Sequence, residues 1–304
     1  MKFTLLLTLI FSIVFLNIPA NVIAQDEEDS EIWDGSFWDD DFESSFSIKH
    51  PTVELKYGMG EPSIHKDLFS SKFEKVNSVE ARFGFMTKKE KLFENTVFEY
   101  TFNYFFLGNI TSDWNKTNEA NSVRINTDAW QWGFGFSKGY GYKFGEKTDL
   151  VLYSTGALAW TSIDFLDTSA TIPIENADMD NAKMDYFGDN FRFGDYFEGG
   201  IKFQVYEPLA FTVGYQRGIV LPRHMFWKWL GGGIVEGIGE GIISWFSDEV
   251  VESSPTFGPI VYFVLKNAYS YGIYELRKKR MNWPFDTEAP LMYENFKVGM
   301  SFGF

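Results

Sequence analysis

Apolar and polar residues alternate along most of the chain after residue 50. A period of two places successive side chains on opposite faces of a β-strand. Eight segments carry this alternation: 53–59, 79–85, 98–106, 130–136, 150–163, 197–205, 209–216 and 296–304. Most of them have one face rich in large apolar residues and one rich in glycine and charge, whereas 150–163 is apolar on both faces. The pattern predicts eight strands.

The connections between these segments alternate in length. Short links are expected at 88–95, 145–148 and 207–208, and long ones at 65–77, 109–126, 166–191 and 221–292. Transmembrane β-barrels combine an even strand number with short turns on one side and long loops on the other. A soluble β-sandwich also alternates, but its inward face packs against a second sheet and does not accommodate rows of ions and glycines. We therefore predict an all-β, antiparallel transmembrane barrel (51–304) with its apolar faces outward.

The first 24 residues have the composition of a secretory signal peptide. Lys2 precedes an apolar stretch (3–16), and a small-residue site ends at Ala24. The apolar stretch is shorter than the roughly 20 residues of a spanning helix, which argues against a membrane anchor. We expect cleavage after Ala24 and export of the rest of the chain.

Composition and charge narrow the function classes. The chain has no cysteine, so disulfides cannot supply the stability of an exported protein. Its net charge is -15, and residues 26–43 contribute ten acids and no base. This balance argues against nucleic-acid binding. Residues 25–50 are predicted to be an acidic periplasmic tail, whose aromatic residues suit docking on a basic periplasmic partner or on the barrel.

The end of the chain carries a family resemblance. The terminal sequence FKVGMSFGF alternates and ends on an aromatic residue. Together with the signal peptide and the alternating strands, it resembles outer-membrane β-barrel proteins of Gram-negative bacteria, of the small eight-stranded type. The resemblance implies an outer-membrane location, contact with outer-membrane lipids and recognition by the barrel-assembly machinery. The assembly signal it implies consists of Phe296, Val298, Met300, Phe302 and Phe304.

The polar strand faces predict a charged barrel interior. An eight-stranded barrel is only wide enough to be filled by its own side chains. Buried charges are tolerated when they are paired and hydrogen-bonded. We expect a plug of mutual ion pairs rather than an open pore, formed by Glu54, Lys56, Glu80, Arg82, Glu99, Glu198, Lys202 and Lys297.

A long insertion (223–291) separates the last two predicted strands. Apolar residues at helical spacing between 226 and 246, and a second apolar stretch after Pro259, predict a helical hairpin. Gly233, Gly237 and Gly241 recur every fourth residue, and each costs about 1 kcal/mol in a helix; we expect them to allow close packing of the second helix. Two more strands at 257–265 and 268–276, giving ten, are the alternative. The hairpin is expected at the lipid headgroups or over the barrel mouth.

Candidate catalytic chemistry is sparse. The three histidines, His50, His65 and His224, lack companions at metal-ligand spacing, so we expect no metal or cofactor. Some small outer-membrane barrels modify lipid A with a histidine, a serine and an acid; here His224 could act with Ser244, Ser247 or Glu240. The leading hypothesis is a non-enzymatic envelope protein with a surface-interaction role. The alternatives are a lipid-modifying enzyme of the outer leaflet and a narrow channel or transport component.

Overall fold

The computed structural model describes residues 49–67, 69, 71–90, 96–115, 124–145, 147–166, 177–188 and 190–304. These residues belong to one compact unit, Ser45–Phe304. The predicted signal peptide (1–24) and the acidic tail as far as residue 48 lie outside the described residues.

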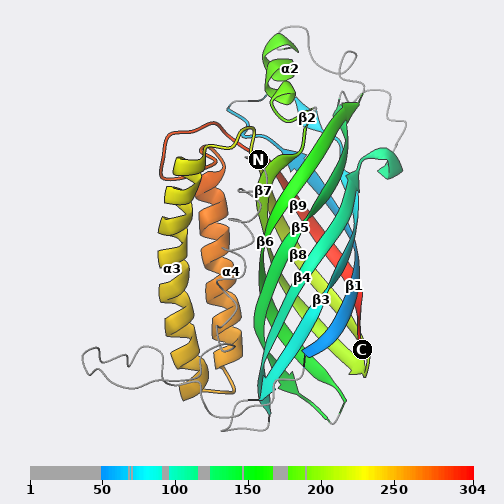
Figure 1. The fold of residues 1–304 in the computed structure, drawn as a ribbon, viewed down its shortest axis with the longest axis vertical. Helices are drawn as coiled ribbons and strands as arrows, with labels where there is room; N and C mark the ends of the chain where they lie inside the picture. Colours follow the sequence, from blue (N-terminus) through cyan, green and yellow to red (C-terminus); the bar gives the residue numbers. More distant parts are fainter. Residues whose placement is uncertain are drawn as a thin grey trace, which may run out of the picture. The chain divides into compact units, whose positions relative to one another are not determined.

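The described residues form a closed antiparallel barrel of eight long strands, as predicted (Figure 1). Around the ring the order is β5-β4-β3-β1-β9-β8-β7-β6, and pairing of β5 with β6 closes it. A two-residue strand, β2, adds to β5 in parallel and lies outside the ring. The strands are β1 (Lys49–Ser63), β2 (Lys72–Phe73), β3 (Val76–Glu90), β4 (Val97–Thr111), β5 (Arg124–Lys143), β6 (Asp149–Leu166), β7 (Arg192–Tyr206), β8 (Leu209–Val220) and β9 (Leu291–Gly303).

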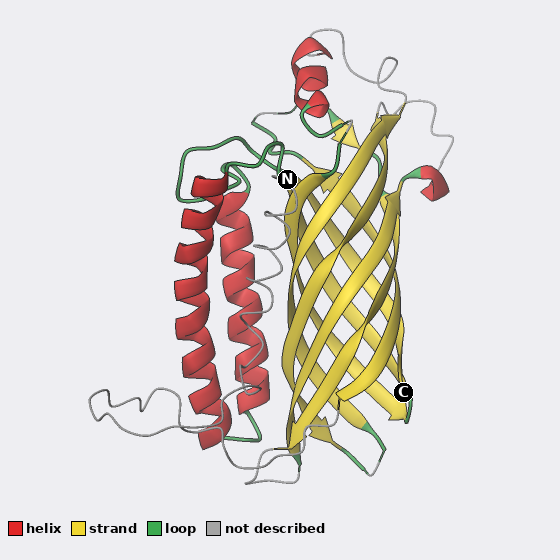
Figure 2. Cartoon of the chain, viewed as in Figure 1, coloured by secondary structure: helices red, strands yellow, loops and turns green. Residues whose placement is uncertain are grey.

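The insertion before β9 forms the predicted helical hairpin (Figure 2). Its helices are α3 (Phe226–Ser253) and α4 (Gly258–Arg277), and Pro259 lies in the first turn of α4, where its missing N–H costs nothing. The ten-strand alternative is wrong, because both segments proposed for it lie almost wholly in α4. Two short helices, η1 (Asp113–Asn115) and α2 (Ala177–Asp185), lie in other loops. Among the described residues, no helix is both long and apolar enough to cross a membrane.

The two rims of the barrel differ, as the connection lengths predict. Strands β7 and β8 are joined by two residues, 207 and 208, and β5 and β6 by residues 144–148. The ends of the barrel chain lie at this same short-turn rim, because the Gly303 amide donates to the Pro208 carbonyl and the Phe304 amide to the Pro51 carbonyl. The opposite rim, here called the long-loop rim, carries α2, η1 and the connections to the hairpin (Figure 1). This arrangement is typical of transmembrane barrels.

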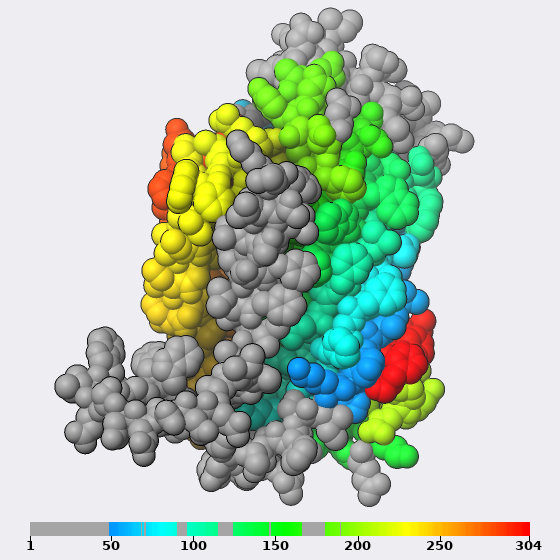
Figure 3. All heavy atoms as spheres, viewed as in Figure 1, coloured from blue at the N-terminus to red at the C-terminus, as the bar shows by residue number. Residues whose placement is uncertain are grey.

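The wall has the inverted polarity of such a barrel. Large apolar side chains on its outer face are exposed, whereas charged side chains inside are buried. Figure 3 shows one stretch of this outer surface, where β9 (red) lies between β1 and β8. Exposed large apolar residues occur on seven of the eight long strands, all except β6, for example Leu55, Phe83, Phe105, Phe134, Ile201, Phe211 and Met300.

The aromatic side chains of β4 point into the barrel, although the alternation predicts that they point outward. The aromatic row of β4 (Phe98, Tyr100, Phe102, Tyr104 and Phe106) is buried inside the barrel. Each member pairs across the sheet with a small residue of β5, and four of these five partners are glycine. A Cβ at Gly135 would lie 2.3 Å from the Tyr104 ring, so the glycines make room for the aromatic row. Phe105 and Leu107 form the exposed face instead.

This packing predicts that Gly135→Ala destabilises the barrel by about 1–3 kcal/mol, the usual cost of overpacking a core. The added methyl must displace the buried Tyr104 ring. A urea titration of the detergent-folded protein measures the change in free energy of unfolding. Gly156→Ala is the matched control in β6, because a Cβ there meets nothing within 4 Å. Equal stability of the two variants would contradict the inward placement of the β4 aromatic row.

Candidate functional site

The candidate site is a buried ion cluster that fills the middle of the barrel. The structure brings together seven of the eight residues predicted for the lumen: Glu54, Lys56, Glu80, Arg82, Glu198, Lys202 and Lys297. All are 4% exposed or less, and they come from β1, β3, β7 and β9. Regular alternation along these four strands places each charge on the inner face. The cluster therefore spans the barrel from one wall to the opposite one.

Arg82 and Glu198 form the centre of the cluster. The Arg82 guanidinium donates to Glu198 Oε2 at 2.6 Å and to Glu80 Oε1 at 2.5 Å, and it lies 3.6 Å from Glu54 Oε2. The other Glu198 oxygen accepts from Lys56 Nζ and from Tyr153 Oη. Charge-assisted hydrogen bonds of this kind are the strong ones in proteins. Every carboxylate of the cluster thus has a cationic partner.

Aromatic side chains surround these ions. The guanidinium carbon of Arg82 lies 4.7 Å from the centroid of the Tyr104 ring, and Tyr104 Oη is 2.9 Å from Tyr196 Oη. Lys297 donates to Glu80 Oε2 at 2.8 Å. Cation–π contact with a desolvated ring adds to the binding of the guanidinium. The inward β4 row is therefore part of the ion cluster and supplies its apolar and phenolic walls.

Glu99, the eighth predicted lumen residue, is not in the lumen, and that prediction is wrong. It lies on the outer face of β4, opposite the aromatic row, and its carboxylate is 3.3 Å from Lys138 Nζ. The lumen cluster consequently has three carboxylates and four cations. Lys202 donates to Tyr100 Oη at 3.1 Å and lies over the rings of Tyr100 and Phe102. Aromatic faces, rather than a fourth carboxylate, accommodate this cation.

Two further polar layers were missed by the sequence analysis. Toward the short-turn rim, Lys88 pairs with Asp149 at 2.5 Å and donates to Gln204 at 2.6 Å. Toward the long-loop rim, Gln131 donates to Thr161 and to Tyr293 Oη. Extending the alternation of β3 to Lys88 would have found the first layer. The second could not be found, because 150–163 is apolar on both faces and its inner face is not apparent from the sequence.

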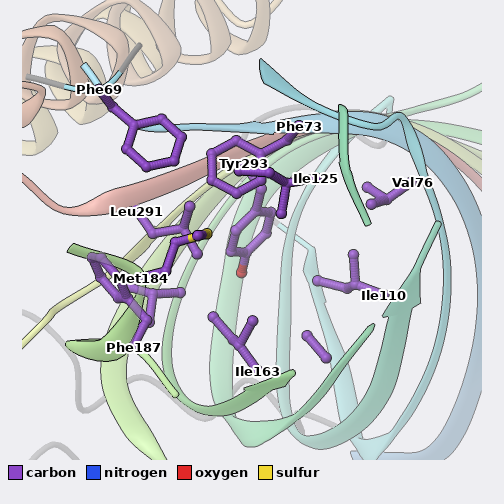
Figure 4. Close-up of a cluster of buried hydrophobic side chains, with 12 residues drawn as sticks. Phe69, Phe73, Val76, Ile110, Ile125, Ile163, Met184, Phe187, Leu291 and Tyr293 are labelled. Atoms are coloured by element: carbon purple, nitrogen blue, oxygen red, sulfur yellow. The ribbon is translucent and has the colours of Figure 1, made fainter. Parts of the chain in front are cut away.

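An apolar cluster lies at the long-loop rim end of the barrel interior (Figure 4). Phe69 and Phe73 from the β1–β3 connection stack at 5.2 Å, and Met184 and Phe187 come from α2 and the turn after it. Ser71 holds α2 in place, because its amide and hydroxyl both donate to the buried Asp180 carboxylate. These side chains pack on apolar residues at the ends of the barrel strands, namely Val76, Ile110, Ile125, Ile163, Val220, Leu291 and Tyr293.

A small cavity of about 30 Å³ lies in this cluster, beside Ile110, Ala129 and Leu291. Its lining is almost wholly apolar. A buried water needs two to four polar partners, and the cavity does not supply them. It has the volume of a packing gap and not of a ligand site.

His224 does not meet its proposed catalytic partners. It precedes α3 and lies among aromatic rings, 5.3 Å from Phe193 and 5.6 Å from Trp229 between centroids. Burial among these rings lowers the pKa of His224. Glu240, Ser244 and Ser247 lie further along α3, roughly 20 Å or more away at 1.5 Å per residue. Within the described residues, no group of acids and histidines could hold a metal ion.

The helix-packing glycines also differ from expectation. A Cβ at Gly233, Gly237 or Gly241 would meet nothing within 4 Å, so these residues face open space and not α4. The glycine that approaches α4 is Gly239, where a Cβ would lie 2.4 Å from Tyr269 Oη. The prediction that Gly233, Gly237 and Gly241 pack against the second helix is therefore wrong, because they lie on a different face of α3 from the contact with α4. The residues of the proposed assembly signal lie on β9, except Phe304, which follows it, and Phe296, Val298, Met300 and Phe304 are exposed.

The chain matches no protein-family model and no curated protein. Among solved structures it is similar to Neisserial surface protein A, with a TM-score of 0.35, 8% identity and coverage of 84% of this chain and 97% of that one. It is also similar to Ail of Yersinia pestis, with a TM-score of 0.28, 8% identity and coverage of 84% and 98%. These values carry no argument about function. The chain is an eight-stranded closed barrel by its own strand pairings.

The ion cluster predicts that Arg82→Met lowers the free energy of unfolding strongly. The substitution leaves the Glu198 and Glu80 carboxylates without their central cation, and breaking a buried ion pair costs about 3–5 kcal/mol. The double variant Arg82→Met/Glu198→Gln should cost less than the sum of the two single changes, because it also removes a stranded charge. Urea titrations of the folded protein measure these changes.

Arg223→Met is the matched control for Arg82→Met. Arg223 lies in the loop before α3 and pairs with Glu288 at an exposed site, where ion pairs contribute little. If the two arginine variants were equally stable, the cluster would not hold the barrel together.

Proposed function

We propose that the chain is a non-enzymatic outer-membrane β-barrel protein of the Gram-negative cell envelope, with a closed lumen and a surface-interaction role. The observation that carries this proposal is the inverted barrel, exposed and apolar outside and filled with paired charges inside. An apolar outer belt is stable in lipid, and a closed barrel leaves no unpaired strand edge there. Among the described residues, buried charged, aromatic and apolar side chains occupy the interior.

The lumen supports a structural rather than a conducting role. The Lys88 layer, the ion cluster, the Gln131 layer and the apolar mouth cluster follow one another between the two rims. An eight-stranded barrel has an interior just wide enough for its side chains. Opening a pore would require separation of buried ion pairs, each of which is costly to break.

The long-loop rim is the part of the barrel suited to interaction. In outer-membrane barrels the long loops face the exterior of the cell and the short turns face the periplasm. On this orientation α2, η1 and the start of the hairpin are at the cell surface. The terminal strand β9 would meet the barrel-assembly machinery, and a periplasmic partner of the acidic tail remains a prediction from sequence. The geometry around His224 does not favour the lipid-modifying alternative.

The proposal predicts that purified protein in planar lipid bilayers produces no single-channel steps. The filled lumen gives ions no route between the rims. A large open porin, added to the same bilayer, is the positive control. Discrete conductance steps from the protein alone would remove the closed-lumen proposal and favour the narrow channel.

A further inference from the structure

The helical hairpin lies along the outside of the barrel wall and extends from rim to rim. Helix α4 contacts the outer faces of β5, β6 and β7, and α3 packs on α4 (Figure 1). Near the long-loop rim, Arg277 makes two hydrogen bonds to Asp195 at 3.0 and 2.8 Å. At the short-turn rim, Tyr142 Oη donates to the Thr256 carbonyl in the turn between the helices. The hairpin therefore neither caps the mouth nor lies flat at one rim.

The contact between hairpin and wall, here called the seam, is polar and closely packed. Lys138 and Tyr140 on β5 both reach Asp248 of α3, with Tyr140 Oη at 2.6 Å. Gly199 on β7 lies under Asn267 of α4, where a Cβ would be 1.9 Å from the amide oxygen. Lys138 lies between Glu99 of the wall and Asp248 of α3, and Asp195 pairs with Arg277 of α4. A wall facing lipid would not carry Asp195 without such a partner. The outer wall is thus built to receive the hairpin.

The charges in the middle of the hairpin are paired across it. Between residues 230 and 246, α3 carries only Glu236 and Glu240. Glu240 accepts from Lys266 of α4 at 2.8 Å, and Glu236 lies 3.8 Å from Arg277. Lys266 is the only charge of α4 between residues 259 and 274. The charges in the middle of the two helices therefore have oppositely charged partners on the hairpin, with the Glu240 side chain half exposed beside Lys266.

The opposite face of α3 is apolar and exposed. Ile234, Ile238 and Ile242 are 55%, 62% and 62% exposed. Trp227 lies at the start of α3, and Trp245 lies about two turns before its end. Exposed apolar patches of this extent mark a surface that contacts another apolar phase. Tryptophan near both ends of a membrane-embedded segment is typical of the lipid–water interface. Nothing in the described part of the chain covers this face.

We propose that the α3–α4 hairpin is embedded in the hydrocarbon region of the bilayer, with the free face of α3 in contact with lipid acyl chains. The inference rests on the proposed outer-membrane location of the barrel. The wall of β5–β7 that the hairpin covers lies at the same height as the exposed apolar belt of the other strands, so the hairpin occupies space that lipid would otherwise fill.

The helix lengths agree with this placement. The 28 residues of α3 and the 20 residues of α4 correspond to roughly 42 and 30 Å at 1.5 Å per residue. The apolar belt of an outer-membrane barrel is about 25 Å tall. Both helices are therefore long enough to run the height of the belt against the wall, although neither is long and apolar enough to cross a membrane on its own. Helix α3 extends beyond the belt, with Lys228 near its start and Asp248 and Glu249 near its end. The two helices form a second, helical layer on one side of a β-barrel.

Spin-label accessibility tests the proposal directly, and the absence of cysteine permits single labels. Nitroxides are attached at Ile238→Cys on α3, at Phe83→Cys on the bare wall of β3, and at Trp114→Cys in η1 at the long-loop rim. The protein is reconstituted in phosphatidylcholine vesicles. Collisions with oxygen, which enters lipid, and with a water-soluble nickel chelate are then compared. All three positions are exposed, so labelling should not disturb the fold.

The proposal predicts that the labels at 238 and 83 collide frequently with oxygen and rarely with the nickel chelate. The label at 114 should collide frequently with the nickel chelate. Nickel access at 238 with protection at 83 would overturn the hairpin placement while leaving the barrel in the membrane. Nickel access at 83 would overturn the proposed membrane location itself. Protection of 238 from both reagents would show that a second copy, rather than lipid, covers the free face.

Discussion

The contact between the Arg82 guanidinium and the Glu198 carboxylate, buried in the centre of the lumen, is the interaction on which the rest of the structure depends. It joins β3 to β7 across the barrel and recruits Glu80, Lys56 and Tyr153. Buried ions are tolerated only when their partners are in place, so each of these side chains constrains the others. The cluster constrains which face of β1, β3, β7 and β9 points inward, and it lies in the middle of the barrel interior.

The outer surface follows from the same constraint. Because most charged side chains of the strands lie in the interior, the outward positions are apolar on most of the wall. Among the charged exceptions, Lys138 and Asp195 lie where the hairpin packs, and Glu99 pairs with Lys138. Polar wall residues and polar helix residues thus pair in the seam, and exposed apolar side chains are frequent on the rest of the wall and on the free face of α3. The short-turn rim, the long-loop rim and the position of the hairpin all agree with one orientation in a membrane.

The strand number, the rims and the helical hairpin could be predicted from sequence, because alternation, connection length and proline position are local signals. The inward direction of β4 could not be predicted from its own alternation, since aromatic residues are equally suited to lipid and to a barrel core. Its partner β5 carried the missing information, because the Gly133–Gly141 stripe leaves room for rings inside. Assigning Glu99 to the lumen followed from that error. Likewise, the spacing of Gly233, Gly237 and Gly241 identifies a helix face but not what the face contacts.

The closed lumen is the central claim, and osmotic water permeability tests it most directly, since water passes where ions are excluded. Proteoliposomes and empty liposomes of the same lipid are compared in a stopped-flow shrinkage assay. The closed-lumen proposal predicts equal rates, because in the described part of the chain paired charges and an apolar mouth cluster lie between the two rims. Faster shrinkage of the proteoliposomes, with the protein correctly folded, would contradict it.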